Sequence, residues 1–490
     1  MAFNSWQFIA FFPLVFLVHY ALPQRLRWMW LLTTSVYFYG IFQPLLLLQI
    51  LLATAAGYFL ALKIEAEPDG THKKKILAWA VYLLVGNLFV FKYTSFVNES
   101  VRDLLSWFGV PYGVPEVHLL LPIGISFYTF QLVSYVVDVY RGTVPAERHF
   151  GIFALYVCFF PKLVAGPIER AKSLLPQLHA RAGFSTEQVV AGLQLAAWGM
   201  FKKVVISDRV APFVNQVYGD PTDVTGVAIT LATLLFAIQV YTDFSGYTDI
   251  ALGCSQMLGY RLSPNFRRPY FATSIQDFWK RWHISLTSWL TDYIYTPLTR
   301  TRKIKLKWYY MMLLSLFLTF LASGLWHGAQ WHFVAWGALH GAYLVISTMT
   351  QKWRRKGMKK VGLNRVPRFH HGLRVFNTFV LVCVAYILFQ AQSLSDAFYM
   401  FTHIGTGWGM AVSELRAFVD GRWAELSFAG FGTAVAMGVD LLQERGGSVR
   451  EMLKSRPTWT RWTLSTGLAL SIALMGAFYD EGQEFIYFQF

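Results

Sequence analysis

The chain has 490 residues, a formal net charge of +16 and a hydrophobic fraction of 55%, but only 14% of its residues are charged. Soluble domains carry about 25% charged residues, so this composition excludes an ordinary soluble protein and indicates a membrane protein. The three cysteines, Cys158, Cys254 and Cys383, lie far apart in apolar sequence. They imply neither a disulfide framework nor a thiolate metal site.

Apolar runs recur along the whole chain, with lengths near the roughly 20 residues that a helix needs to cross a bilayer. In chain order they cover residues 8–22, 28–39, 45–62, 76–91, 119–140, 150–163, 189–200, 224–239, 308–325, 333–347, 375–389, 428–442 and 464–478. Backbone in lipid must form helices or a barrel, and these runs lack the alternation of barrel strands. We therefore predict an all-α polytopic membrane protein with roughly 10–13 membrane helices. We expect one membrane-embedded domain over residues 1–490, with its catalytic core at about residues 119–350.

The first run has no basic segment before it and no small-residue cleavage site after it, so we expect a retained span. The positive charge lies between the apolar runs, at residues 73–75, 300–307 and 352–374. Such loops face the cytoplasm and attract anionic headgroups, so membrane lipids are expected partners. We expect no nucleic-acid partner, because no nucleic-acid module is visible.

Residues 241–295 interrupt the apolar pattern with Asp243, Asp249 and two prolines, which suggests irregular backbone. At membrane depth such backbone is tolerated only where protein or water covers it. A helix is expected to begin near Ser274, because Ser274 to Asp277 has capping-box spacing. One face of this helix carries Trp279, Trp282, His283, Leu286, Trp289 and Leu290. The helical spacing predicts that His283 lies on a buried aromatic face.

Two histidines are the candidate catalytic residues, namely His283 and His327, which directly follows the apolar run at 308–325. An ionisable group at bilayer depth is costly and usually functional, and imidazole moves protons near neutral pH. We predict that His327 is a general base that activates a hydroxyl; the alternative is a helix-end histidine bonded to a carbonyl. His283 could orient a substrate, stabilise charge or pair with His327, or it could be a packed histidine. The spacing allows a shared site but does not establish one.

Two further histidines are expected to be structural. On one straight helix His340 would lie roughly 20 Å from His327, so it should not share the site unless the helix is broken. We expect a packing or interfacial role for His340 and a place at the rim for His332.

Polar and aromatic residues near the histidines suggest a substrate tunnel. Its candidate lining residues are Asp243, Ser245, Trp279, Trp282 and Trp326. Asp243 could also orient an imidazole or cap a helix, and Asp249 is expected to be structural. The candidate residues for binding coenzyme phosphates are Arg267, Arg268 and Arg281, with lipid headgroup anchoring as the alternative. No metal site is expected, because the relevant helices lack a His-x-x-x-His pair.

Several motifs taken together resemble the membrane-bound O-acyltransferase family (MBOAT), most closely its bacterial alginate O-acetyltransferase branch. They are Leu-Pro-Ile-Gly-Ile-Ser-Phe-Tyr at 121–128, Ala-Gly-Pro-Ile at 165–168, Asp-Phe-Ser-Gly-Tyr-Thr-Asp at 243–249, Phe-Trp at 278–279 with Arg-Trp-His-Ile-Ser-Leu at 281–286, Leu-Thr-Asp-Tyr-Ile-Tyr at 290–295, Gly-Leu-Trp-His-Gly-Ala at 324–329, Trp-Gly at 336–337, His-Gly at 340–341 and Glu-Phe-Ile-Tyr-Phe-Gln-Phe at 484–490. The resemblance implies a ring of membrane helices around a central funnel or tunnel. It places the family's invariant histidine at His327 and its second conserved position at His283.

The resemblance also implies a reaction and its partners. An acetyl group would pass from cytoplasmic acetyl-CoA across the bacterial inner membrane to a periplasmic SGNH-type acetyltransferase partner, for O-acetylation of a polysaccharide such as alginate. No permanently bound cofactor is implied. One departure concerns residues 296–303, where the branch commonly has a Gly-Gly-Asn-Arg turn. The departure bears on the polysaccharide system and the local partner contact, and not on the histidine motifs.

Three alternatives remain open at this stage. Within the family, the reaction could be D-alanyl transfer to teichoic acid from a carrier protein. Outside it, the chain could be a transporter with the histidines in a proton relay. It could also be a structural scaffold of a polysaccharide secretion complex.

Overall fold

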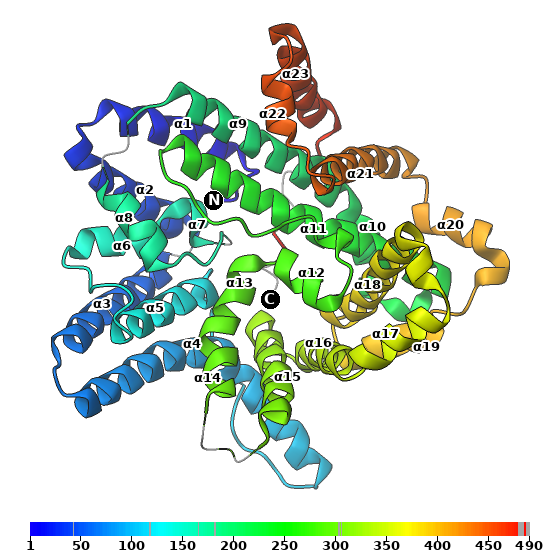
Figure 1. The fold of residues 1–490 in the computed structure, drawn as a ribbon, viewed down its shortest axis with the longest axis horizontal. Coiled ribbons are helices and arrows are strands. Elements are labelled where there is room, and N and C mark those ends of the chain that lie inside the picture. Colours follow the sequence, from blue (N-terminus) through cyan, green and yellow to red (C-terminus); the bar gives the residue numbers. More distant parts are fainter. Residues whose placement is uncertain are drawn as a thin grey trace. The chain divides into compact units, whose positions relative to one another are not determined.

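The computed structural model describes residues 1–42, 44–116, 119–164, 166–180, 183–301, 304, 306–478 and 485–486, except for the side chains of Phe42, Asn364 and Arg450. Every regular element in this part of the chain is a helix (Figure 1). Parts of three motifs lie outside the described residues: Ala165, residues 302–303, and residues 484 and 487–490 of the closing motif.

Within the described residues, 7 helices are long and apolar enough to cross a membrane. They are Pro44–Ala66, Gly70–Trp107, Thr186–Gly219, Gly226–Met257, Trp308–His327, Pro367–Gln390 and Trp423–Glu444. An eighth span is counted if Trp331–Met349 and Gln351–Lys360, which are bent by 61° at their junction, form one broken helix. The predicted all-α polytopic class is confirmed.

Fewer helices meet this criterion than the roughly 10–13 expected, because several apolar runs form short or interrupted helices. The run at 150–163 folds as α6 (Phe150–Cys158) and α7 (Phe160–Leu163), with Pro161 in the first turn of α7. Proline lacks the N–H that would continue the preceding helix, so the chain starts a new one there. The run at 8–22 gives α1, an apolar helix of 16 residues that is shorter than the seven membrane-length helices.

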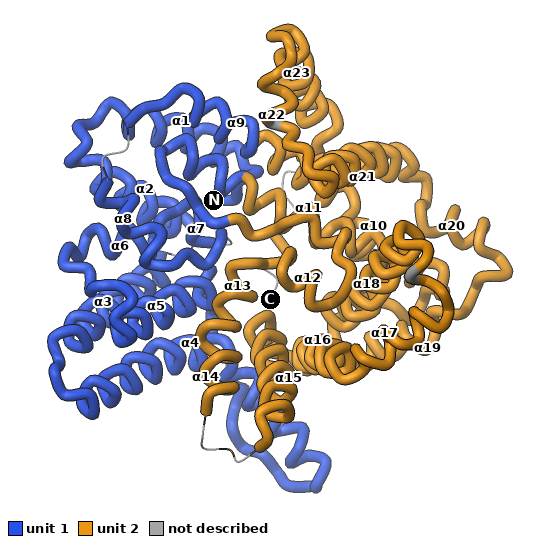
Figure 2. Tube along the Cα trace, viewed as in Figure 1, with its two compact units in different colours: residues 1–196, 250–263 blue, residues 197–249, 264–490 orange. Residues whose placement is uncertain are grey.

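The chain divides into two compact units, of which unit 1 comprises residues 1–196 and 250–263 (Figure 2). Its elements are α1 (Trp6–Ala21), η1 (Gln24–Leu26), α2 (Arg27–Phe42), α3 (Pro44–Ala66), α4 (Gly70–Trp107), α5 (Ile125–Tyr140), α6, α7, α8 (Ala171–His179) and most of α9 (Thr186–Met200). Gly57 of α3 permits close packing on α5, since a Cβ there would lie 2.8 Å from Leu132 Cδ2. The rings of Tyr135 and Phe153 lie 4.6 Å apart and extend this apolar core to α6.

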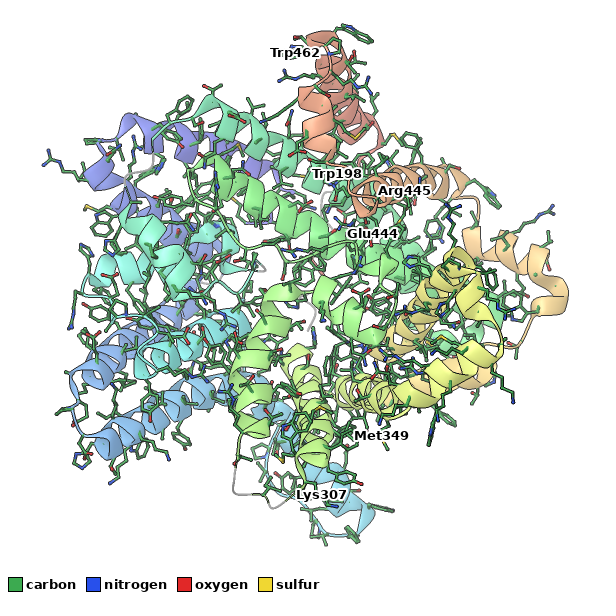
Figure 3. The ribbon with its side chains drawn as sticks, viewed as in Figure 1. Trp198, Lys307, Met349, Glu444, Arg445 and Trp462 are labelled. Atoms are coloured by element: carbon green, nitrogen blue, oxygen red, sulfur yellow. The ribbon has the colours of Figure 1, made fainter. Side chains whose placement is uncertain are left out.

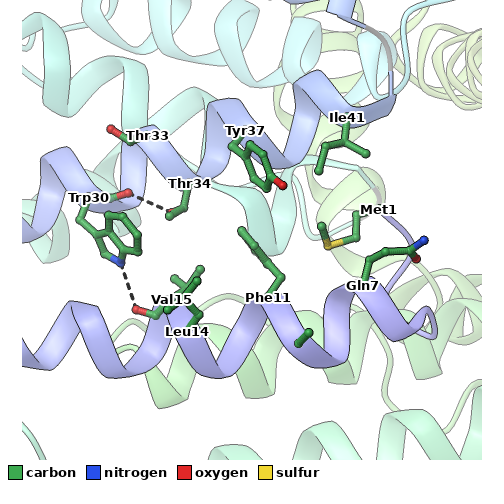
Figure 4. A pocket seen from close by; sticks show the side chains of 11 residues that line it. Met1, Gln7, Phe11, Leu14, Val15, Trp30, Thr33, Thr34, Tyr37 and Ile41 are labelled. Carbon is green, nitrogen blue, oxygen red and sulfur yellow. Dashed lines mark hydrogen bonds between the residues drawn. The ribbon is translucent and has the colours of Figure 1, made fainter.

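Unit 1 contains a cavity of about 480 Å³ between α1 and α2 (Figure 4). Its lining is mostly apolar, and the Trp30 indole donates a hydrogen bond to the Val15 carbonyl across it at 3.0 Å. None of the predicted site residues lines this cavity.

Unit 2 comprises residues 197–249 and 264–490. Its elements are the π-helix η2 (Phe201–Ser207), α10 (Asp208–Gly219), η3 (Pro221–Asp223), most of α11 (Gly226–Met257), η4 (Pro269–Phe271), α12 (Ile275–Arg281), α13 (Ile284–Leu290), η5 (Thr291–Tyr295), α14 (Thr296–Thr299), α15 (Trp308–His327), α16 (Trp331–Met349), α17 (Gln351–Lys360), η6 (Leu363–Arg365), α18 (Pro367–Gln390), α19 (Leu394–His403), η7 (Trp408–Met410), α20 (Ala411–Val419), α21 (Trp423–Glu444), α22 (Val449–Lys454) and α23 (Thr458–Met475). All of the candidate site residues lie in this unit. That the two units act as one domain, with a ring of helices around a funnel, stays a prediction.

Candidate active site

His283 and His327 come together in unit 2, with their ring centroids 6.4 Å apart. Both are buried, with 0% and 3% of their surface exposed. Two imidazoles at this separation are close enough to act on the same bound group. The structure therefore brings the two histidines together, as the sequence spacing allowed, and their shared catalytic role stays a prediction.

His327 is the last residue of α15, and a tight hairpin between α15 and α16 sets its position (Figure 1). The helices approach closely because Gly324 and Gly337 face each other. A Cβ on Gly337 would lie 2.5 Å from the Phe320 carbonyl oxygen, and a Cβ on Gly324 would collide with the Phe333 carbonyl. A side chain at either glycine would force the helices apart, so this pair fixes the end of α15 against the start of α16.

His283 lies in a break between α12 and α13, with φ 43° and ψ 54°. The prediction of one continuous helix from Ser274 to Leu290 is therefore wrong. The left-handed conformation costs a non-glycine residue about 1–3 kcal/mol and persists only where surrounding contacts impose it. Here the Arg267 amide donates to the Arg281 carbonyl at 2.8 Å, and the Ile284 amide donates to the Asn265 carbonyl at 2.9 Å. The predicted helix start is confirmed, since the Ser274 hydroxyl accepts the Asp277 amide at 3.1 Å.

Aromatic rings wall the two imidazoles. The Phe244 centroid lies 4.8 Å from that of His283, and the Trp326 centroid lies 5.6 Å from it. Trp336 and Phe389 pack edge-on to His327, at 4.9 and 5.2 Å. Such surroundings exclude water and strengthen electrostatic interactions with a bound group. The Trp336 indole nitrogen is buried and has no hydrogen-bond partner among the described residues, which makes it a candidate donor to a bound group.

The other two histidines of the hairpin differ from each other. Because the chain is broken after His327, His340 is placed behind Trp336, with its ring centroid 4.8 Å from that indole. It accepts a hydrogen bond from the Trp279 indole at 3.3 Å, which suits the packing role expected for it. His332 is 3% exposed and its ring bonds the Leu388 carbonyl and the Gln330 side chain, so its predicted place at the rim is wrong.

The predicted tunnel residues are all buried. The Trp326 ring packs beside both His283 and His327. The Trp279 ring packs instead against His340. Trp282 packs instead on Phe278 and Phe266, with centroid distances of 5.5 and 5.0 Å. Their role as a tunnel lining stays a prediction.

Asp243 and Ser245 belong to a buried polar cluster on α11. Asp243 forms an ion pair with Lys203 at 2.7 Å, and Lys203 also pairs with Asp208 at 2.8 Å. The neighbouring Lys202 donates to the Ser245 hydroxyl at 2.9 Å and pairs with Asp249 at 2.8 Å. The paired state of Asp249 agrees with the structural role expected for it.

Lys202 and Lys203 were not among the predicted site residues, although the sequence carries a signal for them. Both follow the apolar run at 189–200 directly, and a cation within a membrane helix needs a partner. They lie in the π-helix η2, and both side chains pair with carboxylates of α11. The carboxylates of the Asp243–Asp249 motif thus have buried cations as partners.

The end of the chain also reaches α11. The Ile486 amide donates to an Asp243 carboxylate oxygen at 2.9 Å. The Phe485 ring stacks on Tyr247 at 4.5 Å and lies 5.6 Å from Phe244, the ring that contacts His283. The described residues of the closing motif therefore pack directly behind the site.

The three arginines predicted to bind phosphate differ in their contacts. Arg268 and Arg281 both pair with Glu444, near the end of α21 (Figure 3), at 2.8 and 2.9 Å. Their guanidinium groups already hold a carboxylate, with which a coenzyme phosphate would have to compete. Arg267 has an exposed side chain, so the phosphate prediction is strongest for it.

Arg281 also pairs with Asp277 in the first turn of α12, at 2.9 Å. Burial raises the pKa of Asp277, but the hydrogen bonds from the Thr273 amide and Arg281 outweigh it and hold that pKa below its usual value. Among the described residues, no three His, Cys, Asp or Glu side chains cluster as metal ligands would.

The helices and the buried imidazole pair define a multi-pass membrane protein with a site suited to proton transfer. The chain belongs to the membrane-bound O-acyltransferase family, whose model matches residues 34–385, and it is accordingly an acyltransferase. It is 37% identical to the probable alginate O-acetylase AlgI of Azotobacter vinelandii, over 85% of this chain and 80% of that protein. It is 32% identical to the peptidoglycan O-acetyltransferase of Helicobacter pylori, over 81% and 78% of the two chains. It is 27% identical to the teichoic acid D-alanyltransferase of Streptococcus thermophilus, over 66% and 84%.

Proposed function

We propose that this protein is an O-acetyltransferase of the bacterial inner membrane that carries acetyl groups toward an extracytoplasmic polysaccharide. The donor would be cytoplasmic acetyl-CoA, and the acceptor would be a hydroxyl on a periplasmic SGNH-type partner. The observation that carries the proposal is the pair of buried imidazoles, 6.4 Å apart within an aromatic wall. The similarity to alginate and peptidoglycan O-acetyl enzymes supports acetyl as the group transferred.

His327 would act as the general base. The acceptor hydroxyl oxygen attacks the thioester carbonyl carbon, and a C–O bond forms as the hydroxyl proton passes to the imidazole. Collapse of the tetrahedral intermediate breaks the C–S bond, and the leaving thiolate takes the proton from His327. A positioned base of this kind contributes about 10²–10⁴-fold to the rate.

The oxyanion of the intermediate needs hydrogen-bond donors that are in place before the reaction. His283 and the indole N–H of Trp336 are the candidates, because one ring centroid lies 6.4 Å and the other 4.9 Å from that of His327. Bringing donor and acceptor into one walled site supplies the proximity that the reaction requires.

The test is transfer in proteoliposomes that contain the full chain, with labelled acetyl-CoA on one side and an acceptor on the other. We expect label on the acceptor only when acetyl-CoA faces the cytoplasmic loops. Transfer from a D-alanyl carrier protein in place of acetyl-CoA would identify the family alternative instead. Movement of unmodified polysaccharide or acetate without any acylated product would contradict the proposal and indicate a transporter. Absence of both transfer and movement would favour the structural scaffold.

A further inference from the structure

Asn265, in the loop between α11 and α12, is 1% exposed and bonded to the segment that carries His283. Its backbone carbonyl accepts the Ile284 amide at 2.9 Å. Its side-chain oxygen Oδ1 accepts both the Ser285 amide at 3.1 Å and the Ser285 hydroxyl at 2.9 Å. One buried residue thus receives three hydrogen bonds from the two residues that follow His283.

Through these bonds Asn265 caps the N-terminus of α13. The first amides of a helix have no partner within the helix, and the residue at the N-cap usually satisfies one of them with its own side chain. His283 occupies the N-cap position of α13 and makes no such bond. Asn265 satisfies the Ile284 and Ser285 amides in its place, so the imidazole is not needed as a cap and can face His327.

The same contacts explain the backbone conformation at His283. The helix is broken there by a left-handed residue, and the Asn265 bonds after it and the Arg267–Arg281 bond before it hold both sides of the break. We call the hydrogen bonds between residues 265–267 and 281–285 the clamp. Arg268, which directly follows residues 265–267 in the chain, is a second non-glycine residue with positive φ. Loss of the clamp would let α12 and α13 relax toward the continuous helix that the sequence periodicity favours, which would turn the imidazole away.

We propose that Asn265 is a positioning residue of the acyltransferase site, which acts on the reaction through His283. This inference rests on the proposed function, in which His283 takes part in transfer. It assigns to Asn265 Oδ1 the task of holding the imidazole in its productive orientation.

The test compares Asn265→Leu, which keeps the size of the side chain and removes its acceptor, with Asn265→Asp, which keeps the acceptor. Both are measured in the full chain, reconstituted with labelled acetyl-CoA, per folded molecule. We expect the leucine variant to lose about 10²-fold in kcat, since misplacement by about 1 Å can have that effect. Its KM for acetyl-CoA should stay within about twofold, because transition-state geometry and not donor binding is lost. The aspartate variant should keep transfer within about fivefold of the wild type, because its oxygen still accepts the Ser285 amide.

A double-mutant cycle separates positioning from general damage to the fold. In a His283→Ala background, Asn265→Leu should cause no further loss of the residual transfer, because its effect passes through the missing imidazole. The matched control is Asn98→Leu in unit 1, at another buried asparagine, which donates to the Pro115 carbonyl and accepts from Tyr112. The control should lower stability and leave kcat per folded molecule unchanged. If Asn265→Leu does not insert, Asn265→Ser, whose shorter side chain cannot reach Ser285, replaces it.

Three results would overturn the inference: wild-type kcat in the leucine variant, failure of the aspartate variant to retain transfer, or additive losses in the cycle. A failure of the proposed function is distinguishable from these. It would appear as wild-type transfer by His327→Ala or His283→Ala in the same assay, whatever the Asn265 variants do.

Discussion

The α15–α16 hairpin and the α12–α13 segment each supply one histidine to the site, but they hold it in different ways. His327 ends a regular helix, and the glycines that fix it lie within the same hairpin. His283 sits at a break with left-handed backbone, and its supports come from residues 265–267 and from Phe244 in α11. Close packing of the two helices of its own hairpin holds His327, the candidate base, whereas hydrogen bonds from the loop at residues 265–267 hold the segment that carries His283.

The largest effect is expected from His327→Ala. If His327 is the general base, transfer should fall by about 10²–10⁴-fold with normal insertion. The matched control is His332→Ala, which removes another buried histidine of the same hairpin, whose ring bonds the Leu388 carbonyl and the Gln330 side chain. Labelled transfer per folded molecule would check both variants. Equal losses in the two variants would mean that the hairpin tolerates no change, and the assignment of a base to His327 would fall.

The hairpin itself can be opened at Gly337. Gly337→Leu should force α15 and α16 apart and destabilise the fold by about 1–3 kcal/mol, as overpacking does. Transfer should fall with it, because the end of α15 carries His327. Gly430→Ala in α21, where a Cβ meets nothing within 4 Å, is the control and should be neutral or slightly stabilising. Thermal midpoints in detergent would compare them, and a Gly337→Leu variant as stable as wild type would disprove the close-packing argument.

Glycine and alanine variants of the two histidines should distinguish the two kinds of support. The difference in stability between glycine and alanine should have opposite signs at His283 and at His327. Glycine adopts positive φ without cost, so His283→Gly should be more stable than His283→Ala by about 1 kcal/mol. His327 has helical backbone at the last position of α15, where glycine is still the poorer residue but by less than the roughly 0.5–1 kcal/mol of a helix interior, so His327→Gly should be slightly less stable than His327→Ala. Denaturation of the four variants in one detergent would give both differences. The same sign at both positions would contradict the contrast between a strained break and a regular helix end.

This contrast also marks what the sequence could predict. The apolar run at 308–325 identified α15 and its end near His327, and capping-box spacing identified the start at Ser274, because those features depend on neighbouring residues. The break at His283 could not be predicted, because helical spacing continues through it and the hydrogen bonds that hold it come from residues 265–267, outside the helix. Likewise the partners of Arg268 and Arg281 could not be predicted, because Glu444 is brought to them from α21 by the fold.

The pairing of Lys202 and Lys203 lies between these cases. At membrane depth a charged side chain needs a partner of opposite charge. The sequence could therefore have predicted that the two lysines form ion pairs with the two aspartates of the 243–249 motif. Which lysine meets which aspartate depends on the π-helical register of η2, which no sequence periodicity indicates.

The smallest expected effect tests how far the α12–α13 segment depends on charge. Asp277 accepts the Thr273 amide and pairs with Arg281, and its pKa is lowered in the folded protein. A carboxylate of this kind stabilises the fold above its unfolded pKa of about 3.9 and loses that contribution as the pH falls through the folded value. Asp277→Asn should therefore cost less than about 1 kcal/mol at pH 7, since the pair is partly exposed.

The gap between Asp277→Asn and wild type should stay constant from pH 7 to about pH 5 and shrink below about pH 4. Thermal midpoints measured across this range would show the change in the gap. A gap that widens on acidification would contradict a stabilising role for the ionised Asp277 carboxylate. Transfer at pH 7 should fall far less than in Asn265→Leu, because the backbone bond between Arg267 and Arg281 does not need the carboxylate. A comparable loss in both variants would mean that the ion pair, and not the hydrogen-bonded clamp, positions His283.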